Sequence, residues 1–271
     1  MTTRLTIPQL EQLSKETRIH LLKMIYDAKS GHPGGSLSSV EIMLTLYFHI
    51  MNHDPKDPNR DRFILSKGHS APLLYTVLME AGYISWSNDQ LRKFGCILQG
   101  HPDAPKINGV EISSGSLGNG LSVAAGLAAA TRIDEKKGMI YCLVGDGECD
   151  EGLIWEGAMM ASSRGLDNLI AIVDRNMLQI DGCTEDVICL EPFTDKWRAF
   201  GWNVIECDGH SYPELFKAFE AAILHKGKPT VIVAHTIKGK GVSFMENNVD
   251  FHGKAPNGKE IEQALRELES A

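Results

Sequence analysis

Two oxygen-bearing side chains, Asp146 and Asn176, each follow an apolar run that is typical of a buried strand. The runs span residues 139–144 and 169–173, and a helical pattern separates them along the chain. Parallel strands end at one edge of a sheet, so both side chains are expected there. Carboxylate and amide oxygens suit a hard divalent cation such as Mg²⁺, Ca²⁺ or Mn²⁺, and the Leu178 carbonyl is a third candidate ligand. Taken alone, the Gly145-Asp146-Gly147 triplet is weak evidence and favours a tight strand-to-helix turn.

The same turn could accept a phosphate group. Gly147 has no side chain, which lets the backbone approach a ligand closely, and a helix that begins near Asp150 would point its N-terminus at an anion. A dinucleotide fingerprint would need a third glycine, but Asp150 occupies that position. Glu148 and Glu151 would also repel a pyrophosphate placed directly on the turn. The pattern therefore favours a diphosphate held through a cation over a dinucleotide.

Four histidines lie in loops that are rich in glycine and proline: His32, His69, His101 and His252. Histidine donates and accepts hydrogen bonds near neutral pH and can act as an acid or a base. One such histidine would most simply be a structural loop residue. Four of them in similar settings suit a substrate with many hydroxyl groups and a phosphate.

The elements that position these residues alternate between helix and strand. Helices are expected from Thr6 to about Lys29, opened by a Thr6–Gln9 capping box, and over 40–50, 121–136, 153–163, 197–200 and 212–225 and from Lys259. Strands are expected over 62–65, 139–144, 169–173, 203–205 and 230–234. Continuously apolar strands between helices predict an α/β fold, a parallel sheet with helices on both faces. No linker or low-complexity stretch divides the chain, so residues 1–271 are expected to form a single domain.

Composition excludes several classes of partner. The formal net charge is −8 and the basic residues are scattered, which argues against nucleic acid or an anionic membrane as a main partner. The six cysteines form no C-x-x-C pair, and the N-terminus has no apolar signal segment. A cytoplasmic protein with reduced thiols is expected.

Four more segments accompany the Gly-Asp-Gly…Asn pair. They are Ser30-Gly31-His32-Pro33-Gly34, Leu65-Ser66-Lys67-Gly68-His69, Gly100-His101-Pro102 with Ser114-Gly115-Ser116-Leu117-Gly118, and Phe251-His252-Gly253-Lys254-Ala255-Pro256. With these motifs, residues 19–256 resemble the transketolase family of thiamine diphosphate enzymes. Two details depart from the family pattern: one residue is inserted between His101 and Gly115, and Phe251 stands where a larger aromatic residue is common.

The resemblance implies a thiamine diphosphate-binding fold and a role for each motif residue. Asp146, Asn176 and the Leu178 carbonyl would bind the cation. Cofactor contacts would come from His69, Gly115, Leu117, Gly147, Asn176 and His252, with Glu151 and Glu156 at a subunit interface near the pyrimidine end. His32, His101 and His252 would face the substrate as catalytic residues.

The resemblance also implies a partner. In this family the glutamate that activates the cofactor and the arginines that hold the substrate phosphate lie in later domains, which residues 1–271 do not contain. A split enzyme is therefore expected: a companion chain carries the pyrimidine-binding and C-terminal domains, in an α₂β₂ assembly acting on sugar phosphates. The proposed reaction moves a two-carbon ketol unit from a ketose phosphate to an aldose phosphate.

Other interpretations stay open from the residues. The chain could be half of a different thiamine diphosphate enzyme, such as a 1-deoxyxylulose-phosphate synthase relative or the α chain of a 2-oxo acid dehydrogenase. It could also be a non-catalytic module that binds thiamine diphosphate. The sequence does not distinguish a natural split subunit from a fragment, and it does not select the sugar phosphates or the cation.

Overall fold

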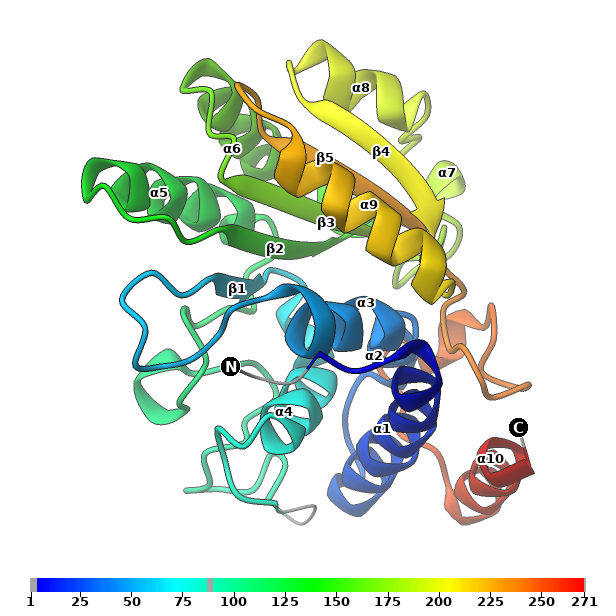
Figure 1. Cartoon of the computed structure of the whole chain (residues 1–271). Coiled ribbons are helices and arrows are strands. Elements are labelled where there is room, and N and C mark those ends of the chain that lie inside the picture. Colours follow the sequence, from blue (N-terminus) through cyan, green and yellow to red (C-terminus); the bar gives the residue numbers. More distant parts are fainter. Residues whose placement is uncertain (1–3, 87–89, 271) are drawn as a thin grey trace.

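The computed structural model describes residues 4–86 and 90–270, and its centre is a sheet of five parallel strands (Figure 1). The spatial order is β1-β2-β3-β5-β4. The strands are β1 (Arg62–Leu65), β2 (Ile140–Gly145), β3 (Leu169–Arg175), β4 (Asn203–Asp208) and β5 (Thr230–His235). All four pairings are parallel, so every strand ends at the same edge. The expected parallel α/β fold is confirmed.

Helices cover both faces of this sheet (Figure 1). One face carries α1 (Ile7–Ala28), α3 (Val40–Thr45), α4 (Ala71–Glu80), α9 (Tyr212–Leu224) and α10 (Gly258–Ser270). The other face carries α5 (Asn119–Ile133), α6 (Gly152–Ser163) and α8 (Phe193–Ala199). Two short helices, α2 (Pro33–Leu37) and α7 (Thr184–Val187), lie in the loops at the carboxyl edge.

The strand sequences explain this layering, because successive side chains of a strand point to opposite faces. In β2, Tyr141 and Leu143 pack into the core beneath α1, α4 and α9, whereas Cys142 and Val144 pack into the core beneath α5 and α6. Both sets are buried, so the strand is apolar at every position. This is the pattern from which two covered faces were predicted.

The expected elements are present with small shifts in their bounds. The Thr6 backbone N–H donates to Gln9 Oε1 at 2.9 Å, which confirms the capping box at the start of α1. The helix expected over 40–50 ends as α-helix at Thr45 and continues as one π-helical turn, Leu46–Ile50. The second half of the glycine-rich loop is helical instead of irregular: Pro33 opens α2, where the N–H that proline lacks is not needed.

The turn after β2 also differs from the expectation of one helix from about Asp150. Residues Gly147–Asp150 form a 3₁₀ turn capped by Asp146, and α6 starts separately at Gly152. Within the described ranges, no helix has the length and apolar character needed to cross a membrane.

Candidate functional site

A cavity of about 150 Å³ opens at the carboxyl edge of the sheet, where the loops after β1, β2, β3 and β5 meet. Its lining includes seven of the residues selected from the sequence: His69, Leu117, Asp146, Gly147, Asn176, Leu178 and His252. Four unselected residues also line it with polar groups: Lys67, Glu148, Gln179 and Lys238. Segments separated by more than 200 residues in the chain therefore meet in one site.

The three candidate cation ligands lie side by side. Gly145 of β2 is in register with Asp174 of β3, which brings the two strand ends together. The Asp146 carboxylate accepts the Gly147 N–H at 2.8 Å and the Met177 N–H at 2.6 Å, while Asn176 Oδ1 accepts the Leu178 N–H at 3.1 Å. The Met177–Asp146 bond thus ties the loop after β2, which carries the carboxylate, to the loop after β3, which carries the amide and the carbonyl.

The chemistry of this set fits a hard cation. Burial and the neighbouring Asp174 carboxylate raise the pKa of Asp146 to about 6, and the Arg175 guanidinium, 3.4 Å away, offsets them only in part. The Leu178 carbonyl accepts a hydrogen bond from the Lys238 ammonium at 2.8 Å, so a cationic group already lies at this oxygen. Within residues 4–86 and 90–270, no group of three or more His, Cys, Asp or Glu is arranged to hold a metal. A cation here would therefore depend on the single Asp146 carboxylate together with amide, carbonyl and cofactor oxygens.

A buried ion pair lies beside the cavity. Lys67, after β1, pairs with Asp174, at the end of β3, and both side chains are almost fully buried. Lys67 Nζ also donates to the Gly35 carbonyl at 2.8 Å, and Asp174 accepts from Ser38 at 2.7 Å and from Asn176 Nδ2 at 3.1 Å. Burial alone would raise the pKa of Asp174, but Lys67 and the hydrogen bonds outweigh it and hold the pKa at about 2. The pair thus fixes two segments to the sheet: α2, and the loop after β3 that carries Asn176 and Leu178, called the cation loop below.

A second buried carboxylate, Glu148, joins three further segments. It accepts hydrogen bonds from the Gly118 N–H at 2.8 Å, from the Gly145 N–H at 3.0 Å and from the Ser66 hydroxyl. From the sequence, Glu148 is expected to repel a phosphate placed directly on the turn. In the structure its hydrogen bonds also hold the start of α5 against the ends of β1 and β2.

Three of the four selected histidines form a cluster. The ring centroids of His32, His69 and His252 lie 5.2 to 5.5 Å apart. Burial is the main cause that lowers the pKa of each ring, to about 4 for His32 and about 3 for His252, and nearby cations add to it. All three rings are therefore neutral at neutral pH and can present one donor and one acceptor each.

The remaining selected residues lie outside this cluster. His101 is exposed, and a Cβ added at Gly115 would lie 3.0 Å from its ring, so the two loops touch. Glu151, directly before α6, and Glu156, on α6, are exposed and do not line the cavity. Glu151 lies close to the 114–118 loop, because a Cβ added at Gly118 would be 2.9 Å from the Glu151 Cβ.

Lys238 also belongs to the site. By sequence alone its segment, Lys238-Gly239-Lys240-Gly241, fits a phosphate loop and a surface turn equally. In the structure Lys238 is buried, and Nζ lies 2.9 Å from His252 Nδ1. Burial, followed by the Lys67 charge, lowers the pKa of Lys238 to about 8. Its position directly after the apolar strand β5 was the available signal, since the other site residues also follow strands.

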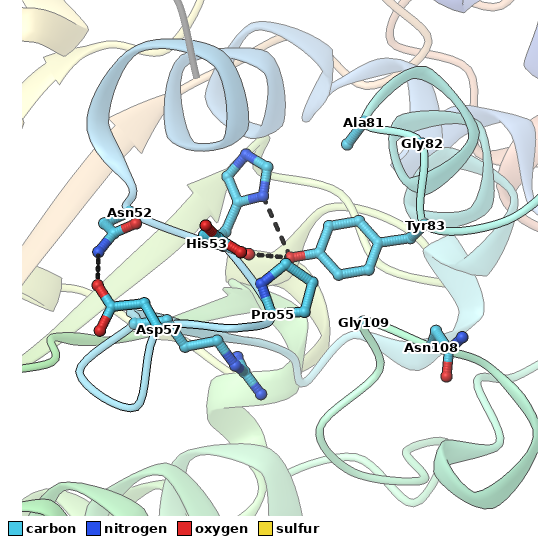
Figure 2. A pocket seen from close by; sticks show the side chains of 11 residues that line it. Asn52, His53, Pro55, Asp57, Ala81, Gly82, Tyr83, Asn108 and Gly109 are labelled. Carbon is cyan, nitrogen blue, oxygen red and sulfur yellow. Dashed lines mark hydrogen bonds between the residues drawn. The ribbon is translucent and has the colours of Figure 1, made fainter. Parts of the chain in front are cut away.

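A larger cavity of about 930 Å³ lies elsewhere, lined by residues 52–55, Asp57, Arg60, residues 81–83, Asn108 and Gly109 (Figure 2). Several of its polar side chains are already paired with one another or with a neighbour. His53 Nδ1 is bonded to the Tyr83 hydroxyl at 3.1 Å, Asn52 donates to Asp57 at 2.6 Å, and Arg60 pairs with Glu111. The smaller cavity, with its convergent polar groups, is the better candidate for chemistry.

Comparisons with known proteins agree with this choice. The family model described as "Transketolase, thiamine diphosphate binding domain" matches residues 10–269. The chain is 43% identical over 266 residues to a subunit of the apulose-4-phosphate transketolase of Phocaeicola vulgatus, and the match covers 97% of this chain and 94% of that protein. It is 46% identical over 243 residues to 6-deoxy-6-sulfo-D-fructose transketolase subunit SqwG of Clostridium sp. (strain MSTE9), and that match covers 88% of each chain.

A solved structure shows the same fold. Transketolase from Campylobacter jejuni superposes with a TM-score of 0.91 and 32% sequence identity, covering 98% of this chain and 43% of that one. The chain thus spans less than half of that transketolase, but nearly all of the two relatives that are named as subunits.

Proposed function

Because this chain belongs to the transketolase family and carries its thiamine diphosphate-binding domain, we propose that it is one subunit of a two-chain transketolase. The observation that carries the proposal is the convergence of Asp146, Asn176, the Leu178 carbonyl and the neutral histidine cluster at one edge of the sheet. The reaction is transfer of a two-carbon ketol unit from a ketose phosphate to an aldose phosphate.

The residues divide the work by their chemistry. Asp146, Asn176 and the Leu178 carbonyl would hold Mg²⁺ against the cofactor diphosphate, and Lys238, His69 and His252 would supply its further contacts. When bound, thiamine diphosphate supplies the electron sink that lets the bond beside a ketose carbonyl break. His32 and His101 would then face the substrate and either form hydrogen bonds to its hydroxyls or move their protons.

The size of the site supports a companion chain. Small-molecule sites usually enclose roughly 300–1,000 Å³, whereas this cavity has about 150 Å³. It suits a diphosphate group better than the whole cofactor. A companion chain in an α₂β₂ assembly would complete the site over the pyrimidine end.

The exposed apolar side chains indicate where such a chain would dock. Four apolar side chains on α5 and α6 are more than a third exposed: Val123, Leu153, Met159 and Met160. Glu156 is on α6, and Glu151 directly precedes it. A patch of this kind is typical of a protein–protein interface.

The test is a ketol-transfer assay on the purified chain and on the complex that it forms with its companion chain. Donors would be xylulose 5-phosphate, apulose 4-phosphate and 6-deoxy-6-sulfo-D-fructose, because two relatives are named for the last two. Thiamine diphosphate, Mg²⁺ and an aldose phosphate would be present, and aldehyde release would be followed.

We expect transfer by the complex and none by the lone chain. Transfer by the lone chain would contradict the need for a partner. Cofactor binding without transfer from any donor would favour the non-catalytic module, and condensation with pyruvate would favour a 1-deoxyxylulose-phosphate synthase relative.

A further inference from the structure

Arg92, in the loop between α4 and the Ala104–Lys106 turn, reaches the histidine cluster although the proposed function gives it no role. Its Nη1 donates to Ser30 Oγ at 3.1 Å, and its Nη2 lies 3.4 Å from His32 Nδ1. Its Nε is buried without a hydrogen-bond partner among the described residues. The guanidinium therefore lies against the loop that carries His32.

The backbone around Arg92 holds the side chain in this direction. Arg92 has φ 58°, in the left-handed region that a residue with a long side chain rarely occupies. Its N–H donates to the Leu98 carbonyl at 2.7 Å, which closes the turn. A Cβ added at Gly100 would lie 2.8 Å from Arg92 Cζ, so the guanidinium occupies the space beside that glycine. Backbone strain maintained in the native state indicates that the position of this side chain matters.

The contact with His32 has a definite chemical consequence. A guanidinium has donors and no acceptor, and it stays protonated in proteins. His32 Nδ1 must therefore accept, which places the proton of the neutral ring on Nε2. None of the hydrogen bonds found within residues 4–86 and 90–270 uses His32 Nε2, and the ring lies against those of His69 and His252. The Nε2–H donor is available to a ligand.

We propose that Arg92 is a positioning residue that fixes His32 as the Nε2–H tautomer, so that His32 donates a hydrogen bond to a substrate oxygen instead of accepting a proton. The role toward substrate rests on the proposed transketolase function, but the tautomer does not. The cationic or titratable groups facing His32 are Arg92, His101, Lys238, His69 and His252, and after burial itself Arg92 contributes most to keeping the ring neutral.

The same arrangement occurs at a second histidine of the cluster. Lys238 Nζ lies 2.9 Å from His252 Nδ1, so a cation also faces the Nδ1 atom of that ring. Two rings thus have Nδ1 turned toward a cation. Arg92 and Lys238, from distant parts of the chain, each place a donor at the Nδ1 atom of one ring.

Nitrogen-15 NMR of the histidine rings in the full-length chain tests the tautomer directly. In the wild type, His32 should show a protonated Nε2 and an unprotonated Nδ1 at pH 7. Arg92→Met should give a mixture of the two tautomers, and Arg92→Lys, which can still donate, should restore much of the wild-type pattern. Arg198→Met, on the exposed surface of α8, is the matched control and should change nothing.

Kinetics of the complex with the companion chain test the consequence. Arg92→Met should raise the KM for the sugar donor by about tenfold, the effect of one hydrogen bond to a charged or oriented group. His32→Gln, whose amide nitrogen lies near the position of Nε2, should retain clearly more activity than His32→Leu.

Two outcomes would overturn the proposal: a wild-type His32 protonated on Nδ1, or an Arg92→Met spectrum identical to the wild type. Equal activities of His32→Gln and His32→Leu would exclude the donor role. A wild-type complex that transfers no ketol unit would refute the proposed function, while the NMR result would still decide the tautomer.

Discussion

The ammonium of Lys238 donates a hydrogen bond to the carbonyl of Leu178 at 2.8 Å, although the two residues are 60 positions apart in the chain. The Leu178 carbonyl is one of the three candidate cation ligands, so a protein cation and a metal ion would compete for one oxygen. A cofactor diphosphate would relieve this competition, because its charge attracts Lys238 away from the carbonyl while it ligates the metal.

Replacement of Lys238 by methionine should therefore change the affinities for thiamine diphosphate and for a divalent cation differently. Thiamine diphosphate affinity should fall roughly tenfold to a hundredfold, the loss of a hydrogen bond to a charged group. Affinity for Mn²⁺ alone should not fall, because the competing ammonium is gone. Fluorescence titration would measure the affinity for thiamine diphosphate, and electron paramagnetic resonance would measure the affinity for Mn²⁺. Lys240→Met, in the same segment, is the control, and an equal loss of cofactor affinity there would contradict the assignment.

A buried cluster away from the cavity positions the Lys238 segment. Glu41 forms a two-oxygen pair with Arg18 at 2.7 and 2.9 Å and accepts from His210 Nδ1 at 2.9 Å. His210 Nε2 accepts the Ile237 N–H, and Arg18 Nε donates to the Lys240 carbonyl. The cluster therefore holds the chain on both sides of Lys238.

Glu41→Gln should destabilise the fold by about 3–5 kcal/mol, because it leaves Arg18 as a buried charge without a partner. Burial opposes ionisation of Glu41, but Arg18 and His210 outweigh it and lower its pKa below the ordinary value of 4.5. Because the pKa is lower in the folded state, ionised Glu41 stabilises the fold at pH values above 4.5. This contribution is lost as the pH falls from 4.5 through the folded-state pKa. Urea unfolding at pH 7, 5 and 4 should show a smaller acid loss for Glu41→Gln than for the wild type. Exposed Glu11→Gln should match the wild type.

The Lys67–Asp174 pair predicts strong coupling between two positions. Lys67→Met or Asp174→Asn alone should each cost about 3–5 kcal/mol, since either leaves a buried charge unpaired. The double variant should cost clearly less than the sum. Chemical denaturation of the four proteins would measure the coupling, and additive losses would mean that the two charges do not depend on each other.

The exposed face of α6 predicts a separation of stability from assembly. Met159 is 59% exposed, so Met159→Glu should change the free energy of unfolding of the lone chain by no more than about 0.5 kcal/mol. In the complex it would bury an unpaired carboxylate and should weaken binding of the companion chain at least tenfold by sedimentation or titration calorimetry. Leu224→Glu, on α9 at the other face, is the control. If both variants bind the companion chain equally well, Met159 does not lie in the interface.

The sequence was sufficient to predict features that depend on one segment or on neighbouring strands. Asp146 and Asn176 could be placed together because each follows an apolar strand and parallel strands end at one edge. The positions of Lys238 and Arg92 could not be predicted, because their roles depend on which distant loop they meet. The hydrogen bonds of Glu148 could not be predicted for the same reason: its charge is visible in the sequence, but the Gly118 N–H and the Ser66 hydroxyl that donate to it come from distant segments.

The strand order has a consequence for how the site forms during protein synthesis. Among the described strands, β4 pairs only with β5, and β5 inserts between β4 and β3. While residues 230–235 are still inside the ribosome, β4 has no neighbour and β3 lacks one of its two. Lys238 and His252 emerge later still. Because chains fold as their segments leave the ribosome, the cation loop on β3 is made well before its two distant partners arrive. On the proposed assignment of Lys238 and His252 to cofactor binding, the complete site forms only after these segments are translated, and a newly made chain would take its cofactor from the free pool of the cell.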